Sequence, residues 1–408
     1  MANRVHSAVA ANVLCKREVF NLKEKLTELF WETYNYRDGV SVYFAPGRVN
    51  LIGEHTDYNG GHVFPCALTI GTYAAVKCRD DNKIRLYSGN FPEKGVCEIE
   101  VGDYSYIKQP DWCNYPVGVI WALYKKGYVL DRGIDIMYYG DIPSGSGLSS
   151  SASIEVLTAY FLNDVFGFGI ELTDIALLCQ YSENNFNGSN CGIMDQFASA
   201  NGKAGNAIFL DTATLTYEYA PVRLDGQSLL IINSNKKHSI VSSHYNDRRR
   251  EAETALSQLQ REIDIQSLGE LSESEFEKYK YCIEDDLLLR RARHAVYENQ
   301  RTIKAKKALN ENDIKLFGEL MVDSHVSLRD DYEVSCRELD VIVEEALKLD
   351  GVWGIRMTGG GFGGCCVGIF DTDKIEDIKN KIDRVYKDRC GIKADFYDVS
   401  IGEGPHRL

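Results

Sequence analysis

The sequence predicts an α+β protein with two domains. Three observations indicate this class: segments with strand periodicity recur over residues 40–141, charged helical segments dominate residues 245–347, and strand segments return in the last third. The chain has 408 residues, of which 44% are hydrophobic and 26% charged, which is typical of a soluble protein long enough for two or three domains. We place the boundary near residues 205–225 and divide the chain into 1–215 and 216–408.

The first half of the chain mixes helices and strands. Residues 16–36 carry apolar side chains near helical spacing, so the chain is expected to open with a helix. A strand that begins near residue 40 is expected to end in a turn at Pro46–Gly47. The segments that follow predict strands at 71–80, 83–90 and 133–141, and helices at 152–167 and 174–186.

The second half is mostly helical until a short strand pair appears. Helices are expected at 245–259, 287–309, 314–330 and 338–349. Two strands at 354–358 and 365–370 then surround a glycine cluster, and a charged helix and a final strand near 394–400 close the chain. No Pro-rich or Ser-rich tether and no internal repeat interrupts these segments, so two domains would meet through a packed interface.

Charge and cysteine usage exclude several classes of protein. The formal net charge is -14 and the pI is near 5.2, which disfavours binding to nucleic acid or to an anionic membrane. No run of 18 apolar residues is present, and the N-terminal residues lack the pattern of a signal peptide. The 12 cysteines show no CxxC spacing, and Cys365 and Cys366 are adjacent. We therefore expect a reduced, cytoplasmic protein.

The stretch GDIPSGSGLSSSAS, residues 140–153, lies between a predicted strand and a predicted helix. Its glycines allow close backbone approach, and free N–H groups at the helix start favour a negative ligand such as a triphosphate. A serine-capped helix start without a ligand explains the stretch equally well. A linker is disfavoured by the flanking elements, and a reactive serine by the missing GxSxG pattern and base. The P-loop pattern is absent because no lysine follows the glycines.

The stretch GRVNLIGEHTDYNGG, residues 47–61, gathers Arg48, Glu54, His55 and Asp57 around a glycine-bounded turn. Several hydrogen-bond acceptors on one turn suit a ligand rich in hydroxyl groups, such as a sugar. A solvated turn with a capping aspartate is the structural alternative. A metal site is weakly supported because the stretch has a single histidine and no HExxH spacing.

The stretch RMTGGGFGGCCVGIF, residues 356–370, has five glycines between residues 359 and 364. Such a cluster between two strands requires unusual backbone angles or very close packing. A phosphate-facing loop and a tight structural crossing both explain it, and the residues themselves slightly favour the crossing.

In this order, the three stretches resemble the signature motifs of the small-molecule kinases that include galactokinase, homoserine kinase, mevalonate kinase and phosphomevalonate kinase. The resemblance narrows to the galactokinase branch through GRVNLIGEHTDYN and continues in SENNFNGSNCGIMDQF, INSNKKHSIVSSHY, RRARH, SLRDDYEVSC and RMTGGGFGGC. It covers nearly the whole chain from about residue 40 to residue 400. It implies a two-domain small-molecule kinase fold: an N-terminal ribosomal-protein-S5-domain-2-like domain, a C-terminal ferredoxin-like domain, and the active site between them. It also allows the last strand to return to the N-terminal domain.

The resemblance further implies that ATP phosphorylates the C1 hydroxyl of α-D-galactose with Mg²⁺ as cofactor, the first committed step of galactose catabolism. Asp195 would be the base for the anomeric hydroxyl, and Arg48 the cation beside it. The sugar contacts implied by similarity are Arg48, Glu54, His55, Thr56, Asp57, Gly192, Asp195 and Tyr245. The ATP contacts implied are Trp112, Tyr115, Gly145, Ser146, Gly147, Leu148, Ser149, Ser150 and Ser151, and the Mg²⁺ ligands are Ser151 and Glu183.

Some positions depart from the family pattern. The family pattern predicts a larger or apolar residue at position 144 and a glycine or alanine at position 146, but this chain has serine at both. His62 also replaces an apolar residue. Two alternatives keep the fold: a non-catalytic sensor of galactose and ATP, and a kinase for N-acetylgalactosamine or another C1 sugar. The intact SSSAS segment and the presence of Asp195 disfavour the sensor. Kinases for N-acetylgalactosamine typically have an apolar residue at the position of Thr56, so the threonine favours galactose. A monomer is expected.

Overall fold

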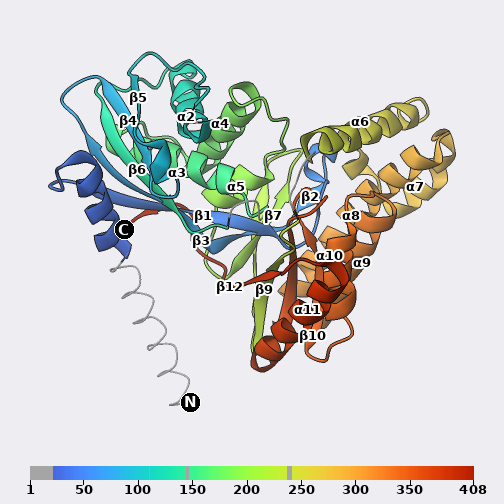
Figure 1. Ribbon diagram of the computed structural model, residues 1–408. Helices are drawn as coiled ribbons and strands as arrows, with labels where there is room; N and C mark the ends of the chain where they lie inside the picture. Colours follow the sequence, from blue (N-terminus) through green and yellow to red (C-terminus); the bar gives the residue numbers. More distant parts are fainter. Residues whose placement is uncertain (1–21, 110, 144–146, 237–240) are drawn as a thin grey trace.

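The computed structural model describes residues 22–109, 111–143, 147–236 and 241–408 (Figure 1). Within this part the strands form a six-stranded sheet in the order β13-β1-β3-β6-β4-β5, a four-stranded sheet in the order β10-β11-β9-β12, and a three-stranded sheet in the order β2-β7-β8. The strand bounds are β1 Ser41–Asn50, β2 His62–Val63, β3 Pro65–Cys78, β4 Lys83–Ser88, β5 Cys97–Glu100, β6 Ile134–Gly140, β7 Asn206–Asp211, β8 Tyr217–Pro221, β9 Gln227–Asn233, β10 Val352–Thr358, β11 Cys365–Asp371, β12 Asp395–Val399 and β13 His406–Arg407.

Helices cover both faces of the six-stranded sheet and extend beyond it. A helical segment at 22–34 precedes β1. The later helices are α2 Asn114–Lys125, α3 Ser150–Phe166, α4 Leu172–Asn185, α5 Met194–Ala200, α6 Val241–Leu259, α7 Glu273–Tyr279, α8 Asp286–Asn310, α9 Ile314–Asp330, α10 Arg337–Ala346 and α11 Ile375–Cys390. Three-residue 3₁₀ turns include η1 Asp57–Asn59 and η3 Asp111–Cys113. Helices α2 to α5 lie on one side of the sheet, and α6 to α9 extend away from it (Figure 1).

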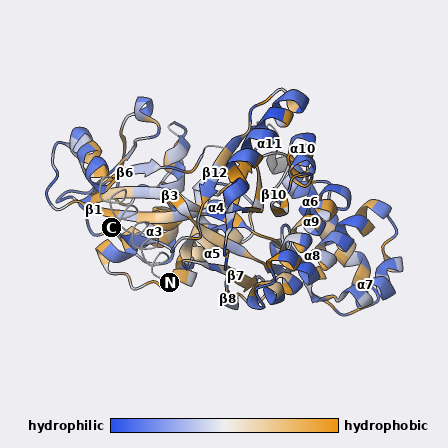
Figure 2. Cartoon of the chain, turned by 90° about the horizontal axis from the view of Figure 1, so that it is seen from below, coloured by the Kyte–Doolittle hydropathy of each residue, from blue (hydrophilic) through white to orange (hydrophobic). Residues whose placement is uncertain are grey.

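The alternation along β3 explains why the six-stranded sheet is covered on both faces. Ala74 and Val76 join the core under α2 to α5, whereas Tyr73 and Ala75 join the core under the helical segment 22–34. Successive side chains of a strand point to opposite faces, so the unbroken apolar run from Tyr73 to Val76 predicts two cores. Figure 2 shows hydrophobic colour along β1, β3 and α5 in the centre, and mostly hydrophilic colour on α6 and α7.

The second half of the chain contains a ferredoxin-like unit. Strand β9 is followed by helices, then by the antiparallel pair β10 and β11, then by α11 and β12, and both β11 and β12 pair with β9. This is the β-α-β-β-α-β order of that motif. Its outer core includes Ile342 from α10 and Ile382 and Tyr386 from α11. The α+β class and the ferredoxin-like unit expected in the second half of the chain are therefore confirmed.

Strand β1 corrects one expectation. The strand does not end at Pro46–Gly47 but continues to Asn50, with a register shift against β3 between Pro46 and Arg48. Proline lacks a ladder N–H, and a bulge accommodates it within the strand. A Cβ on Gly47 would lie 2.8 Å from the carbonyl oxygen of Leu148, so glycine is required by close packing. The continuation matters because it carries Arg48.

Most of the remaining predicted elements agree with the described structure to within four residues at their ends, but the strand expected at 71–80 is β3, which begins earlier, at Pro65. The strands expected at 83–90 and 133–141 are β4 and β6, and the helices expected at 152–167 and 287–309 are α3 and α8. The C-terminal strand β13 pairs with β1 at the edge of the six-stranded sheet. Among the described helices, none combines the length and the apolar character that a membrane span requires.

Candidate active site

Two pockets meet near the start of α3. The first, which we call the acidic pocket, has a volume of about 380 Å³ and is lined by Arg48, Glu54, His55, Asp57, residues 188–192, Met194, Asp195, Tyr245, Asn246, Gly359 and Gly360. The second, which we call the aromatic pocket, has a volume of about 430 Å³ and includes Phe91, Tyr106, Trp112, Tyr115, Tyr138, Ser150 and Ser151. The acidic pocket therefore draws residues from β1, from α6 and from the loop after β10, in both halves of the chain.

Arg48 and Asp195 form a bidentate ion pair on the wall of the acidic pocket. Arg48 Nε donates to Asp195 Oδ1 at 2.7 Å, and Arg48 Nη2 donates to Asp195 Oδ2 at 2.6 Å. The third guanidinium nitrogen, Nη1, donates to the Gly147 carbonyl at 2.7 Å. Arg48 is 4% exposed, whereas the Asp195 side chain is 30% exposed. The carboxylate is thus oriented by a buried cation while one side of it faces the pocket.

Glu54 is buried between the two halves of the chain. Its Oε1 accepts hydrogen bonds from the Thr358 hydroxyl and the Gly359 amide, at 3.0 and 2.9 Å. Its Oε2 accepts from Asn50 Nδ2 and lies 2.6 Å from Arg356 Nη1. A buried carboxylate with this many donors is well compensated. Glu54 therefore lines the pocket but also joins β1 to the glycine-rich loop after β10.

Asp57 explains why residue 192 is glycine. A Cβ built on Gly192 would overlap the Asp57 carboxylate, so any larger residue would displace that carboxylate from the acidic pocket. Burial, reinforced by the negative charge of Asp195, raises the pKa of Asp57 to about 6. Asp57 and Asp195 therefore present two carboxyl groups to the same small space.

His55 and Tyr245 form the aromatic side of the acidic pocket. The ring centroids of His55 and Tyr245 lie 5.5 Å apart. Burial lowers the pKa of His55 to about 3, so its imidazole is neutral near pH 7. Its Nδ1 is hydrogen-bonded to the Tyr58 hydroxyl at 2.7 Å, and its buried Nε2 has no hydrogen-bond partner among the described residues.

Thr56, an expected sugar contact, lies beneath the turn and not on the wall of the acidic pocket. It is fully buried and does not line the acidic pocket, and its hydroxyl donates to the carbonyls of Gly53 and His62 at 2.8 and 2.7 Å. The side chain shapes the turn that presents Asp57. His62, the unusual residue of this turn, stacks on Phe209 at 4.5 Å and has no contact with Arg48 or Asp195.

The serine-rich loop leads directly from one pocket to the other. Ser149, at a left-handed φ of 58°, donates its hydroxyl to Asp195, and Ser150 and Ser151 line the aromatic pocket in the first turn of α3. Gly147 also has a positive φ, of 74°. Leu148 is buried in the core and lines neither pocket. Gly145 and Ser146, two of the expected ATP contacts, lie outside the described residues, as does Ser144.

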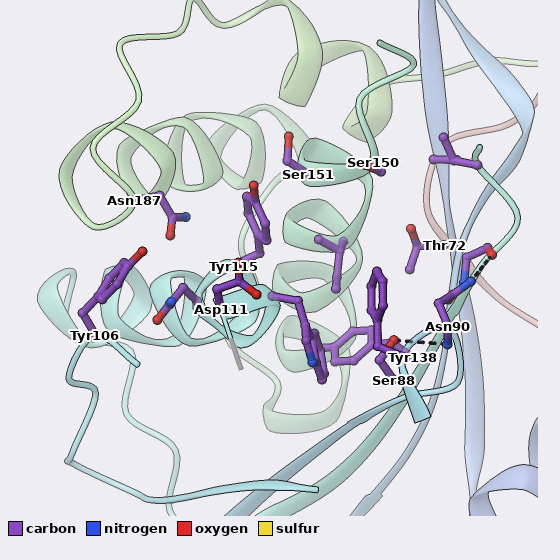
Figure 3. A pocket seen from close by; sticks show the side chains of 16 residues that line it. Thr72, Ser88, Asn90, Tyr106, Asp111, Tyr115, Tyr138, Ser150, Ser151 and Asn187 are labelled. Carbon is purple, nitrogen blue, oxygen red and sulfur yellow. Dashed lines mark hydrogen bonds between the residues drawn. The ribbon is translucent and has the colours of Figure 1, made fainter. Parts of the chain in front are cut away.

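Trp112 and Tyr115, two of the expected ATP contacts, both line the aromatic pocket. Figure 3 shows Tyr115 and Ser151 on one side of this pocket and Tyr138, Ser88 and Asn90 on the other. The Trp112 indole N–H is buried without a hydrogen-bond partner among the described residues. A ring-lined cavity with a few polar groups beside a helix N-terminus suits a nucleotide base attached to phosphates.

Glu183 lies beside a second buried carboxyl group. Gln196 Nε2 donates to Glu183 Oε2 and Glu155 Oε2, at 3.2 and 3.4 Å. The Ser151 hydroxyl also donates to Glu183. Burial, reinforced by Glu183, raises the pKa of Glu155 well above its usual value. Glu155 Oε1 is buried without a partner among the described residues.

Several residues of this region were missed by sequence reasoning. Glu155 interrupts an apolar helix face four residues after Ser151, which is the one local signal that it has a special role. Arg356 and Tyr332 reach the underside of the acidic pocket from residues far along the chain, so no local pattern identifies them.

Family models match three parts of the chain. The galactokinase galactose-binding signature matches residues 28–78, the GHMP kinases N terminal domain matches 114–203, and the GHMP kinases C terminal domain matches 305–388. Galactokinase from Clostridium beijerinckii is 53% identical over 95% of this chain and 98% of that protein. Galactokinase from Bacillus subtilis is 47% identical over 95% of this chain and 99% of that protein.

Solved structures agree with these matches. The crystal structure of Lactococcus lactis galactokinase complexed with galactose superposes with a TM-score of 0.93 at 45% identity, over 95% of this chain and 100% of that one. The Methanococcus jannaschii mevalonate kinase, at 18% identity, superposes with a TM-score of 0.63 over 90% of this chain and 100% of that one, which shows the shared fold alone. With relatives near 50% identity along almost its full length, the chain belongs to the galactokinase family of the GHMP kinases.

Proposed function

We propose that this protein transfers the γ-phosphoryl group of ATP to the C1 hydroxyl of α-D-galactose. The observation that carries the proposal is the Arg48–Asp195 pair, because it lies on the acidic pocket and is hydrogen-bonded to the serine-rich loop that opens the aromatic pocket. A sugar in the first pocket and a nucleotide in the second would bring the acceptor hydroxyl and the phosphate to this pair. The galactose complex of the Lactococcus lactis relative supports the choice of sugar.

The acidic pocket would bind the sugar through groups of complementary type. Asp57 and Asp195 accept hydrogen bonds from sugar hydroxyls, while Arg48 and a neutral His55 donate to sugar oxygens. Tyr245 supplies a ring face beside them, and the glycine at position 192 leaves room for the Asp57 carboxylate. A site that hydrogen-bonds specific hydroxyls rejects epimers strongly, because a misplaced hydroxyl leaves a buried acceptor unpaired.

The aromatic pocket would hold the adenine ring of ATP near Trp112 and Tyr115. The phosphates would then lie at the N-terminus of α3, where free backbone N–H groups, the helix dipole and the hydroxyls of Ser150 and Ser151 face them. We propose that the loop residues 145–147 complete this cradle.

Phosphoryl transfer requires a deprotonated acceptor and a fixed in-line geometry. We propose that the Asp195 carboxylate takes the proton of the C1 hydroxyl, that the C1 oxygen forms the new bond to the γ-phosphorus, and that the bond to the bridging oxygen breaks to release ADP. Arg48 holds the Asp195 carboxylate in place through its two hydrogen bonds, and its positive charge also favours the developing negative oxygen.

The donor set beside α3 fits a Mg²⁺ ion. Ser151 and Glu183 offer oxygen ligands, and a cation there would offset the repulsion between Glu183 and the neighbouring Glu155. Among the described residues no cluster of three or more His, Cys, Asp or Glu side chains has the arrangement of a protein-only metal site. Mg²⁺ typically keeps waters and phosphate oxygens as ligands, so Ser151 and Glu183 would suffice to hold it, and the ion would neutralise phosphate charge.

The Asp195→Asn variant tests the proposed base. We expect kcat with galactose, measured by ADP release, to fall by about 10²–10⁴-fold, because a general base contributes a factor of this size. Binding of a non-hydrolysable ATP analogue, measured by calorimetry, is expected to stay within about twofold, since Asp195 lies outside the aromatic pocket. The exposed Asp323→Asn variant is the control. A near-normal kcat in Asp195→Asn would show that another group is the base.

A substrate panel tests the sugar. The wild-type protein is compared on galactose, N-acetylgalactosamine, glucose and arabinose by the same ADP assay. Galactose is expected to have the highest kcat/KM and glucose, its C4 epimer, to be poor by orders of magnitude. Equal kcat/KM values for galactose and glucose would contradict the proposed site.

Three further features are proposed together with this function. A monomer and a cytoplasmic location are both proposed from the sequence, and the free thiols of the 11 described cysteines suit a reducing compartment. We also propose the division of the chain into residues 1–215 and 216–408, near the hairpin of β7 and β8, with β13 returning to the first part.

A further inference from the structure

The underside of His55 is packed against a buried tyrosine from a distant part of the chain. Tyr332 is fully buried, and its ring centroid lies 4.9 Å from that of His55 and 4.4 Å from that of His294. Tyr332 belongs to SLRDDYEVSC, a segment to which the proposed chemistry assigns no role. A full-sized aromatic ring directly beneath a ligand-facing imidazole controls where that imidazole can lie.

A chain of hydroxyl groups also connects Tyr332 to His55. The Tyr332 and Tyr58 hydroxyl oxygens are 2.9 Å apart, and the Tyr58 hydroxyl lies 2.7 Å from His55 Nδ1. The Tyr332 proton therefore has the Tyr58 oxygen as its one acceptor among the described residues, and the Tyr58 proton is left for His55 Nδ1. The opposite order would leave the buried Tyr332 proton unpaired, whereas this order leaves only the His55 Nε2 proton free, and the His55 ring lines the acidic pocket, where water or a ligand can accept that proton.

This order of donors determines the tautomer of His55. An imidazole that accepts a hydrogen bond at Nδ1 carries its single proton on Nε2 when it is neutral. That Nε2 is the atom that is buried without a hydrogen-bond partner on the acidic pocket. The carboxylates of Asp57 and Asp195 accept hydrogen bonds, so a sugar there needs donors for its own oxygens. A His55 Nε2–H would supply one.

Three arginines hold the segment that carries Tyr332. Arg248 Nε donates to the Tyr332 carbonyl at 2.7 Å, and Arg291 Nη1 donates to the Asp331 carbonyl at 2.6 Å. The Glu333 carboxylate is paired with both Arg290 and Arg291, at 2.6 and 2.7 Å. Glu333 has a left-handed φ of 53°, a conformation that needs such support in a residue other than glycine. Helix α8 therefore fixes Tyr332 through its RRARH sequence.

We propose that Tyr332 is a positioning residue that acts through Tyr58 to keep His55 as the Nε2–H tautomer, so that His55 donates a hydrogen bond to the sugar. The inference rests on the proposed function for the identity of the ligand. The tautomer itself is a property of the protein without any ligand. The tautomer measurement therefore tests the positioning role and the turnover measurement tests the proposed function, and either prediction can be refuted without the other.

The tautomer is measured first, by long-range ¹H–¹⁵N NMR on the full chain labelled at histidine nitrogens. The chain has 8 histidines, and the His55→Gln variant identifies the resonances of His55 by their loss. In the wild type we expect one neutral species with the proton on Nε2. In Tyr58→Phe, which keeps the ring and removes the donor to Nδ1, we expect both tautomers. A wild-type signal with the proton on Nδ1 would overturn the proposal.

Kinetics then separate positioning from simple support of the fold. In Tyr58→Phe the KM for galactose is expected to rise about tenfold, the value of one lost hydrogen bond, while the KM for ATP stays within about twofold. Tyr332→Phe should have a smaller effect, and the double variant should be no worse than Tyr58→Phe alone, because both changes interrupt one chain. Tyr297→Phe, which removes a hydroxyl bonded to Glu277 instead, is the matched control.

Two outcomes distinguish failure of this inference from failure of the proposed function. If wild-type protein shows the Nε2–H tautomer but does not phosphorylate galactose, the proposed function is wrong and the role of Tyr332 in positioning His55 stands. If galactose is phosphorylated but Tyr58→Phe changes neither the tautomer nor the KM for galactose, the positioning role is refuted. Equal increases in the KM values for galactose and ATP would likewise refute it, since they would indicate general loss of structure.

Discussion

Replacing Arg48 by lysine would keep the positive charge beside Asp195 but remove the forked geometry that orients it. Arg48 makes three hydrogen bonds, two to the Asp195 carboxylate and one to the Gly147 carbonyl, all at 2.6–2.7 Å. A lysine ammonium is a point charge on a flexible chain, so lysine at position 48 would replace only one of the three hydrogen bonds that Arg48 makes. Each lost bond to a charged group is worth about 1.5–3 kcal/mol, so two amount to about 3–6 kcal/mol.

The lower end of this range is the better expectation for Arg48→Lys. The Asp195 side chain is 30% exposed, so water replaces part of what the carboxylate loses. A loss of about 3 kcal/mol at the transition state corresponds to a fall in kcat of about 10²-fold. The misplaced base acts in the chemical step, so the KM for ATP is expected to change little.

The assay for Arg48→Lys is steady-state ADP release with galactose and ATP varied in turn, together with a thermal melt. Arg85→Lys is the matched control, because Arg85 makes a bidentate pair with Asp135, at 2.6 Å for both bonds, in the sheet formed by β4 and β6. It should lower the melting temperature without changing kcat by more than about twofold. If Arg48→Lys kept more than about a third of the wild-type kcat, the reasoning from bidentate orientation would be refuted.

Two other properties of the acidic pocket can be tested in the same way. Gly192→Ala places a Cβ on the Asp57 carboxylate, so the KM for galactose should rise by at least about tenfold while the KM for ATP is unchanged; an unchanged KM for galactose would show that Asp57 does not contact the sugar. Burial raises the pKa of Asp57 from 3.8 to about 6, so the folded protein binds this proton more tightly than the unfolded chain does. As the pH falls through about 6, protonation of Asp57 therefore adds to the free energy of unfolding, and this contribution is complete below the pKa of the unfolded chain. The protonated carboxyl is also a poorer hydrogen-bond acceptor, so the KM for galactose rises over the same range. Asp57→Asn should remove that limb of the pH profile, and a flat wild-type profile on both sides of pH 6 would count against the assignment.

Local periodicity was sufficient to predict most of the secondary structure. The alternation in β4 and β6 and the apolar faces of α3 and α8 depend on neighbours within one element, so short sequence windows contain the information. Pro46–Gly47 misled the prediction because the same residue pair marks a turn or a bulge. Whether a turn or a bulge forms depends on contacts with strand β3 and with Leu148, and both lie away from Pro46–Gly47 in the sequence.

The candidate site was predictable only where a motif concentrates several functional residues. Arg48 and Asp195 are 147 residues apart, and their pairing was expected from the resemblance rather than from any spacing. The Thr56 hydroxyl faces backbone carbonyls, and the sequence could not indicate this, because a hydroxyl beside a turn can face either a ligand or the backbone. Tyr332 lies in SLRDDYEVSC, one of the segments that carry the resemblance, but no local pattern indicates its role, since that role depends on a partner 274 residues away.

Glu54 also has a consequence for how the protein is made. It accepts hydrogen bonds from residues 304 and 305 positions later in the chain, and it pairs there with Arg356. Closing so long a segment is entropically expensive, so such contacts form late in folding. On the ribosome, a nascent chain that already contains Arg48, Asp57 and Asp195 would leave Glu54 with Asn50 as its hydrogen-bond donor, because Arg356, Thr358 and Gly359 have not yet been synthesised. The acidic pocket is therefore completed near the end of synthesis, and the emerging N-terminal half is not yet a sugar-binding protein.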